Sequence, residues 1–206
     1  MWYKVNKIRV GTQKIRPKYI YEYSYDFRNK TTTQLANDWW FTYRDTRSWS
    51  VDSNGLHIVW FPWCLWKYID NSYFQNAKKI TMKAHVNIQT YANNMFISKY
   101  DSWETLTCWW NLDTRQSFRK INFNWTEISQ TNASIPYWQY DVQMVFDFVN
   151  KTATLSLSWF ADVTTPLTDS AITNVKNNIN FVGLRFYNDS TSNTASYFRD
   201  IYILVE

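Results

Sequence analysis

Apolar and polar residues alternate regularly between residues 138 and 160. One face of this stretch carries Tyr140, Val142, Met144, Phe146, Phe148, Ala153, Leu155, Leu157 and Trp159, and in the first run Val145 is the one lapse on the polar face. Because successive side chains of a strand point to opposite faces, this period of two predicts two half-buried β-strands. Residues 149–152 separate the two runs, and Asn150 tolerates the left-handed backbone of a tight turn. We therefore expect a hairpin, which is not stable alone and needs a second apolar layer.

The same alternation predicts strands along most of the chain. The predicted strands cover residues 19–27, 39–43, 49–51, 56–61, 79–89, 93–99, 103–110, 117–125, 181–187 and 197–205. The Asn54-Gly55 pair predicts a hairpin between the third and fourth of these, since both residues accept positive φ. About twelve strands without helical periodicity predict one all-β domain, an antiparallel two-sheet jelly-roll sandwich.

Four segments between these strands lack the alternation. Residues 29–37, 126–137 and 161–178 are polar and predict loops, and Pro166 argues against a long helix in the last of them. Residues 62–78 are too apolar for a solvated loop. We expect a short helical turn there, or a loop that caps the sandwich.

The composition narrows the class of protein. Aromatic residues make up 20% of the 206 residues and glycines number only 3, so large rings fill the core with few special backbone positions. The sequence contains no apolar run of about 18 residues, so it predicts no membrane span. The first ten residues lack the apolar core of a secretion signal. Cys64 and Cys108 do not make a disulfide framework. Cys108 alternates in phase with Leu106 and Trp110, which predicts a buried thiol.

The positive charge is concentrated at the N-terminus. Residues 1–20 hold six basic residues and no acid, so the net charge of +5 leaves −1 for the rest of the chain. Residues 1–17 show no single apolar face, which favours a strand that pairs with another chain through its backbone. Pro17 then ends the pairing. We predict a docking arm at 1–18 and a sandwich at 19–206; the alternative is a solvated edge strand guarded by lysines.

The N-terminal residues also resemble a known class. Val5-Asn6-Lys7-Ile8-Arg9-Val10-Gly11-Thr12, followed by Ile15-Arg16-Pro17, resembles the lead-in of many bacteriophage structural proteins, where it precedes a concanavalin A-like or laminin G-like sandwich. The order Tyr25-Asp26-Phe27 to Asn54-Gly55-Leu56-His57-Ile58 is similar to the opening of laminin G-like domains. Arg199-Asp200-Ile201-Tyr202-Ile203 is similar to their final strand.

The resemblance implies a virion protein from the tail, baseplate or capsid surface. Its implied partners are other virion proteins, further copies of itself and a host-surface glycan. The arm residues that match the lead-in, and that the resemblance assigns to assembly, are Val5, Lys7, Ile8, Arg9, Gly11, Ile15, Arg16 and Pro17.

The sequence contains no recognisable set of catalytic residues. His57 and His85 lack ligand spacing, which gives no support to a zinc site, and His85 falls on the polar face of its strand. No two of the four glutamates share a strand at the spacing that glycanases of this fold use. Asp141 and Asp147 share a face but stand roughly 20 Å apart, too far for an acid–base pair. We predict a non-enzyme without cofactors; loop calcium at Asp101 or Asp113 stays open.

Adjacent tryptophans indicate a binding surface instead. Trp109 and Trp110 cannot both point into one core, because the pleat separates neighbouring side chains. If the strands 103–110 and 117–125 are neighbours, their outer face carries a platform of rings, amides and a lysine: Trp103, Trp109, Lys120, Asn122 and Asn124. Such a platform could bind a glycan or a neighbouring subunit, or another segment of the same chain could cover it.

Two functions follow from the sequence, and two further ones are less favoured. The main prediction is a non-enzymatic bacteriophage virion protein that docks by its arm and presents a lectin-like sandwich. The alternative is a free-standing carbohydrate-binding lectin module. A glycanase is a third hypothesis. Nucleic acid is an unfavoured partner, although the arm interleaves Trp2 and Tyr3 with basic residues.

Overall fold

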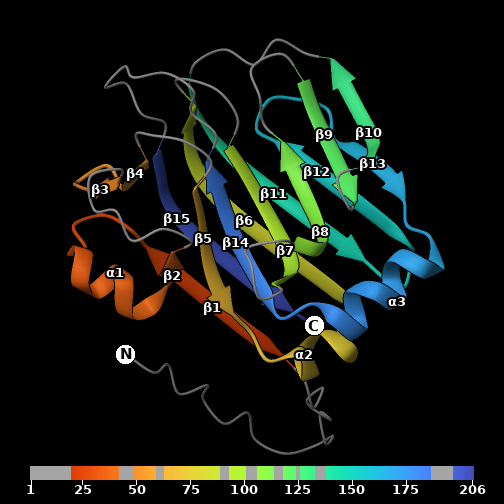
Figure 1. Ribbon diagram of the computed structural model, residues 1–206. Coiled ribbons are helices and arrows are strands. Elements are labelled where there is room, and N and C mark those ends of the chain that lie inside the picture. The colour runs from red at the N-terminus through yellow and green to blue at the C-terminus, as the bar shows by residue number, and fades with distance from the viewer. Residues whose placement is uncertain are drawn as a thin grey trace, which may run out of the picture.

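The computed structural model describes residues 20–41, 49–58, 63–88, 93–100, 106–113, 118–123, 126–132, 138–186 and 197–206. These residues form fifteen strands and three helices (Figure 1). The strands are β1 (Tyr21–Asp26), β2 (Trp40–Phe41), β3 (Trp49–Val51), β4 (Leu56–Ile58), β5 (Trp63–Tyr68), β6 (Lys79–Ile88), β7 (Asn93–Tyr100), β8 (Leu106–Asp113), β9 (Phe118–Phe123), β10 (Thr126–Asn132), β11 (Trp138–Asp147), β12 (Thr152–Leu157), β13 (Val163–Pro166), β14 (Phe181–Phe186) and β15 (Tyr197–Val205). The helices are α1 (Thr32–Asp38), α2 (Asn71–Gln75) and α3 (Asp169–Asn178).

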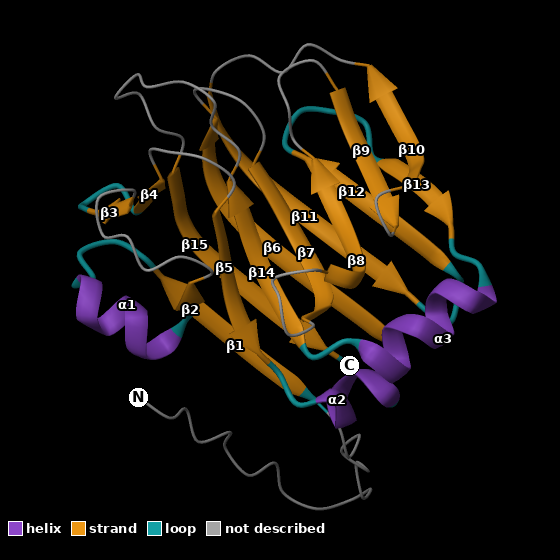
Figure 2. Cartoon of the chain, in the orientation of Figure 1, coloured by secondary structure: helices purple, strands orange, loops and turns teal. Residues whose placement is uncertain are grey.

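The strands make two stacked antiparallel sheets, as the alternation predicts. One sheet has eight strands in the order β13-β12-β11-β6-β15-β4-β3, with β1 also beside β15. The other has seven in the order β10-β9-β8-β7-β14-β5-β2 and lies in front of the first in Figures 1 and 2. The helices lie at the margins of the sheets, so the two layers face each other directly (Figure 2).

The core lies between the sheets, and in β11 and β12 it is built from the predicted inward positions. From the eight-stranded sheet it takes alternate residues of β6, β11 and β12 and the inward residues of β15, among them Met82, Phe146 and Ile203. From the seven-stranded sheet it takes Leu65, Met95, Ile97, Val182 and Leu184. Residues of opposite sheets thus share one apolar layer, which is the second layer that the hairpin of residues 138–160 requires.

That hairpin forms with one change at its turn and one at its end. β11 and β12 pair from Val142–Leu157 to Asp147–Thr152, as predicted. Lys151, not Asn150, takes the left-handed conformation (φ 53°), because the Asp147 carboxylate holds Asn150 by its backbone and side-chain N–H groups. β12 ends at Leu157, and Trp159 turns outward at 76% exposure, so its predicted place on the apolar face is wrong.

The first of the three predicted loops contains a helix. α1 lies where residues 29–37 predict a loop. The Thr31 side chain accepts from the Gln34 N–H, and the Gln34 side chain accepts from the Thr31 N–H. This capping box is a sequence signal of a helix start, and it outweighs the polar composition of the segment.

The other two predicted loops are also wrong. Residues 126–137 contain β10, which pairs with β9 at the edge of the seven-stranded sheet. Residues 161–178 contain the edge strand β13 and then α3. Pro166 ends β13 and does not prevent the helix, because α3 begins beyond it with Thr168 as its cap and buries Ala171 and Val175.

Residues 62–78 hold more regular structure than we expect from the sequence. The predicted short helical turn is α2, capped by Asp70, whose side chain accepts from the Ser72 N–H. The strand β5 precedes it and is missed, because its aromatic residues occur on both faces and mask the period of two. β8 runs three residues later than its predicted span of 103–110.

The predicted Asn-Gly hairpin is present between β3 and β4. The Asp52 carboxylate accepts from the N–H groups of Asn54 and Gly55. Gly55 has φ 139°, and a Cβ at this position would clash with the backbone carbonyl of Phe198. The position therefore requires glycine for its conformation and for the close approach of β15.

The predicted arm, residues 1–18, lies outside the described residues, so its boundary with the sandwich stays a prediction. None of the described helices is long and apolar enough to cross a membrane.

Candidate functional site

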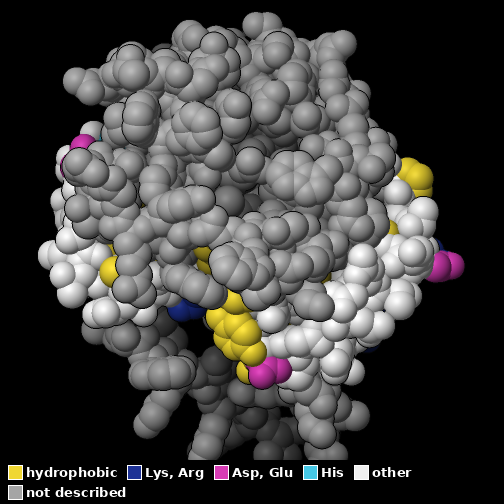
Figure 3. Space-filling model, in the orientation of Figure 1, with side chains coloured by type: hydrophobic (Ala, Val, Ile, Leu, Met, Phe, Trp, Pro, Cys, Tyr) yellow, Lys and Arg dark blue, Asp and Glu magenta, His cyan; other side chains and the backbone are white. Residues whose placement is uncertain are grey.

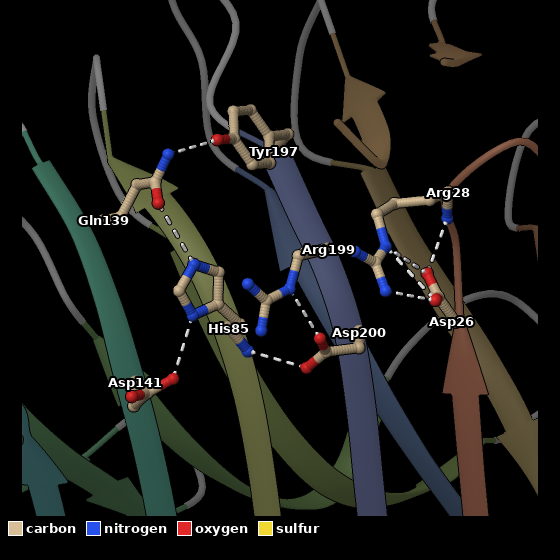
Figure 4. Close-up of polar contacts among 8 residues, drawn as sticks. All are labelled: Asp26, Arg28, His85, Gln139, Asp141, Tyr197, Arg199 and Asp200. Carbon is tan, nitrogen blue, oxygen red and sulfur yellow. Dashed lines mark hydrogen bonds and ion pairs between the residues drawn. The ribbon is translucent and has the colours of Figure 1, made fainter. Parts of the chain in front are cut away.

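A chain of polar contacts crosses the outer face of the eight-stranded sheet (Figure 4). His85 Nδ1 lies 2.9 Å from the Asp141 carboxylate, and His85 Nε2 lies 3.4 Å from Gln139 Oε1. The Gln139 amide donates to the Tyr197 hydroxyl at 2.9 Å. These residues come from β6, β11 and β15, so His85 lies on the polar face of its strand, as predicted, and three strands orient it.

Acidic side chains flank this chain in one row across four strands. The register sets Asp141 opposite His85, His85 opposite Asp200, and Asp200 opposite Asp26. Arg199 Nε donates to Asp200 at 2.8 Å. Arg28 forms hydrogen bonds to Asp26, and these lower the pKa of that carboxyl group. The negative charges of Asp26 and Asp200 are thus balanced by Arg28 and Arg199.

The sequence predicts this face only in part. Within β11 it identifies Asp141 and Asp147 on the polar side, and both lie there. The cross-strand row of Asp141, Asp200 and Asp26 is missed, because neighbours across a sheet leave no mark in sequence spacing. Among the described residues, no group of three or more His, Cys, Asp or Glu side chains is arranged to hold a metal ion.

A Tyr–Lys contact joins β1 of one sheet to β5 of the other. The Lys67 ammonium lies 4.5 Å from the ring centroid of Tyr23, and it donates to the Asp38 carbonyl. Burial lowers the pKa of Lys67 and raises that of Tyr23 strongly. This contact shows which way the side chains of β5 point. Lys67 points between the sheets, so its neighbours Trp66 and Tyr68 point outward.

Aromatic side chains gather on the outer face of the seven-stranded sheet. The Phe181 ring meets Trp66 at 5.8 Å and Tyr68 at 5.5 Å, both edge to face. Trp66 and Phe181 are only 3% and 8% exposed, yet neither belongs to the core between the sheets. Tyr68 is 58% exposed. Figure 3 views this face and shows hydrophobic side chains at the surface beside an acidic one.

The strand register connects this aromatic cluster to the predicted platform. Tyr68 lies opposite Phe181, Phe181 opposite Ser98, and Ser98 opposite Trp109. Residues directly opposite one another in a sheet share a face, so position 109 belongs to the outer row of Tyr68. Position 110 belongs to the row of Ile97 and Val182, which lie in the core.

Two more predicted platform residues fall in the next outer rows. β8 and β9 are neighbours, as the platform requires. The row of Trp66 and Gly183 continues through Phe96 and Asn111 to Asn122. The row after it runs from Arg185 through Asn94 and Asp113 to Lys120.

The remaining predicted residues lie outside the described part of the chain. These are Trp103, Asn124, the calcium candidate Asp101 and the arm residues Val5, Lys7, Ile8, Arg9, Gly11, Ile15, Arg16 and Pro17. The side chain of Cys108, the predicted buried thiol, also lies outside the description. Tyr68 and Phe181 are residues of this face that sequence reasoning missed, although the run of aromatics in residues 63–68 could have indicated Tyr68.

Comparison with known proteins identifies the fold. No family model matches the sequence, and no curated protein matches it. Solved structures do match: lectin II from Ulex europaeus has a TM-score of 0.66 at 11% identity, over 90% of this chain and 98% of that one. The winged bean acidic lectin complexed with methyl-α-D-galactose has a TM-score of 0.64 at 11% identity, over 91% and 98%.

A third structure agrees with these two. Lectin I from Ulex europaeus, in complex with the methyl glycoside of α-L-fucose, has a TM-score of 0.64 at 13% identity, over 89% and 98%. The chain is therefore a concanavalin A-like β-sandwich, the fold class that the sequence predicts.

Proposed function

We propose that this chain is a carbohydrate-binding protein without catalytic activity, and that it binds on the outer face of the seven-stranded sheet. The observation that carries the proposal is the set of outer rows that join the exposed Tyr68, and Phe181 beneath it, to positions 109, 120 and 122. A flat ring covers the apolar face of a sugar, while amides and an ammonium group form hydrogen bonds with its hydroxyls.

The lectin-like neighbours support this choice over the subunit-interface alternative. Two of them are complexes with small sugars, methyl-α-D-galactose and the methyl glycoside of α-L-fucose. Such glycosides are therefore the first ligand class to test. The non-catalytic part of the proposal rests on the sequence, where acidic residues lack the glycanase spacing, and on Asp147, whose carboxylate is engaged in its turn.

A glycan array with the purified chain tests the proposal. We expect saturable binding to one group of glycans and loss of that binding in Trp109→Ala. A variant that keeps wild-type binding would contradict the role of position 109. Self-association of the wild-type chain, without binding to any glycan, would favour the subunit interface instead.

A second candidate function rests on the lead-in Val5–Thr12 and on the basic arm. We propose that, as a component of a bacteriophage particle, the chain docks through residues 1–18 and presents its sandwich to the outside. Such a role is compatible with glycan binding, because the two use different parts of the chain.

Deletion of residues 1–18 tests the docking role. The body should keep its cooperative thermal transition, because the described residues of both sheets already share one core. Co-sedimentation with particles should be lost. If the shortened chain still joins the particle, the arm does not dock it.

A further inference from the structure

The outer face of the eight-stranded sheet contains an open hollow of about 590 Å³. Its volume is within the range of small-molecule sites, roughly 300–1,000 Å³. It lies on the opposite side of the sandwich from Tyr68, so it is not part of the proposed platform. Its lining comes from β6, β11, β12 with the turn that follows, and β15: Lys83, Ala84, His85, Asp141, Val142, Gln143, Ser156, Leu157, Ser158, Asp200 and Tyr202.

Side-chain size explains the hollow. Ser156, Gln143, Lys83 and Tyr202 follow one another across four strands of the sheet. The short serine stands at one end of this row and the longer side chains beside it, so the surface sinks towards β12. Ala84, Val142 and Leu157 are buried in the core, so they border the hollow mainly through their backbone.

The polar groups of the hollow are held in place before any ligand arrives. His85 is fixed between Asp141 and Gln139, and its side chain is only 14% exposed. Ser158 Oγ accepts from the Asp141 N–H at 2.8 Å and donates to the Asp141 carbonyl. Hydrogen bonds of this kind within the protein orient a binding group before the ligand arrives, so less entropy is lost on binding.

Charge distinguishes the two acids of the hollow. Asp200 accepts from Arg199 Nε and from the His85 backbone N–H, so its charge is engaged within the protein. Asp141 is 82% exposed and presents its carboxylate to solvent. Lys83, on the neighbouring strand, is exposed beside it.

We propose that this hollow is a second carbohydrate site, specific for a neutral sugar. The Asp141 carboxylate accepts hydrogen bonds from hydroxyl groups, the Lys83 ammonium donates to ring or hydroxyl oxygens, and the Tyr202 ring forms one wall. An acidic sugar is disfavoured, because its carboxylate meets the exposed carboxylate of Asp141. The inference rests on the proposed function only for its class of ligand, since the residues of the two sites do not overlap.

Backbone NMR of the whole, isotope-labelled chain separates the two sites. Titration with methyl-α-D-galactoside or glucose should shift the amide signals of Lys83, His85 and Ser156, and an equal concentration of glucuronate should not. Equal shifts with glucuronate would overturn the specificity for neutral sugars.

Two variants and a control test the residues of the hollow. Ser156→Phe fills the hollow and should abolish these shifts, while signals around Tyr68 still respond. Asp141→Asn keeps the shape, removes the charged acceptor, and should weaken binding at the hollow at least tenfold. Asp162→Asn removes one exposed carboxylate elsewhere and should change neither site.

The location of the shifts decides between the two proposals. Shifts confined to Tyr68 and Phe181 overturn the second site and leave the proposed function intact. Shifts confined to the hollow support the second site and contradict the platform. Titrations without shifts at either face overturn both.

Discussion

Phe146→Ala is expected to lower the free energy of unfolding by about 3–5 kcal/mol, the range for removal of a buried phenylalanine ring. Phe146 is 1% exposed in the core between the sheets, and it stands in register with Ile80 on β6 and Ala153 on β12. These strands cannot close the space that the ring leaves, because their backbones are joined to each other by the sheet hydrogen bonds.

Thermal or denaturant unfolding checks this prediction. For a chain of this size the loss corresponds to a decrease of about 6–20 °C in the melting temperature. Val145→Ala is the matched control: Val145 precedes Phe146 on the same strand but is only partly buried, on the outer face, opposite Thr81 and Thr154. We expect its effect to stay well below that of Phe146→Ala, and similar losses for the two variants would contradict the assignment of the two faces.

Tyr68→Ala is expected to weaken glycan binding at least tenfold and to leave the fold intact. Tyr68 is the most exposed ring of the aromatic cluster, and it rests edge to face against Phe181. Aromatic side chains of binding surfaces frequently contribute about 2 kcal/mol or more when truncated, and each 1.4 kcal/mol is roughly a tenfold change in affinity. More than half of the ring lies in solvent, so the core loses little.

Affinity for the best array ligand, together with the melting temperature, checks this second prediction. Trp159→Ala is the control, because Trp159 is even more exposed but lies beyond β12 of the other sheet. Unchanged binding in Tyr68→Ala would place the sugar away from the aromatic cluster. Equal losses in both variants would indicate non-specific adhesion to exposed rings.

The described structure confirms the parts of the prediction that depend on strict alternation. The inward positions of β1, β6 and β11 follow from a period of two, because one face of each strand is buried. β15 breaks the period once, between Phe198 and Ile201, where its register against β6 shifts. Alternation fails where side chains on both faces are apolar, as at Trp66 and Phe181, or where local hydrogen bonds decide, as in the capping box that starts α1 at Thr31.

The candidate sites were harder to predict than the fold. The sequence indicates Trp109, Lys120 and Asn122 because rings and amides recur at alternate positions. It gives no sign that Tyr68, on a strand some forty residues earlier, lies in the row of Trp109. The hollow beside Asp141 is likewise invisible, since it depends on Ser156 and Tyr202 being brought to one surface from separate strands.

Local patterning by itself determined that this chain is an all-β sandwich, which residues of its long strands face the core, and which polar groups stay outside. Side-chain alternation is a property of neighbouring residues, so the sequence contains it directly. Only the tertiary structure decided which strands are adjacent and in what register. That choice follows from the packing of two whole sheets, and it alone places Tyr68 in the row of Trp109 and Asp141 beside His85.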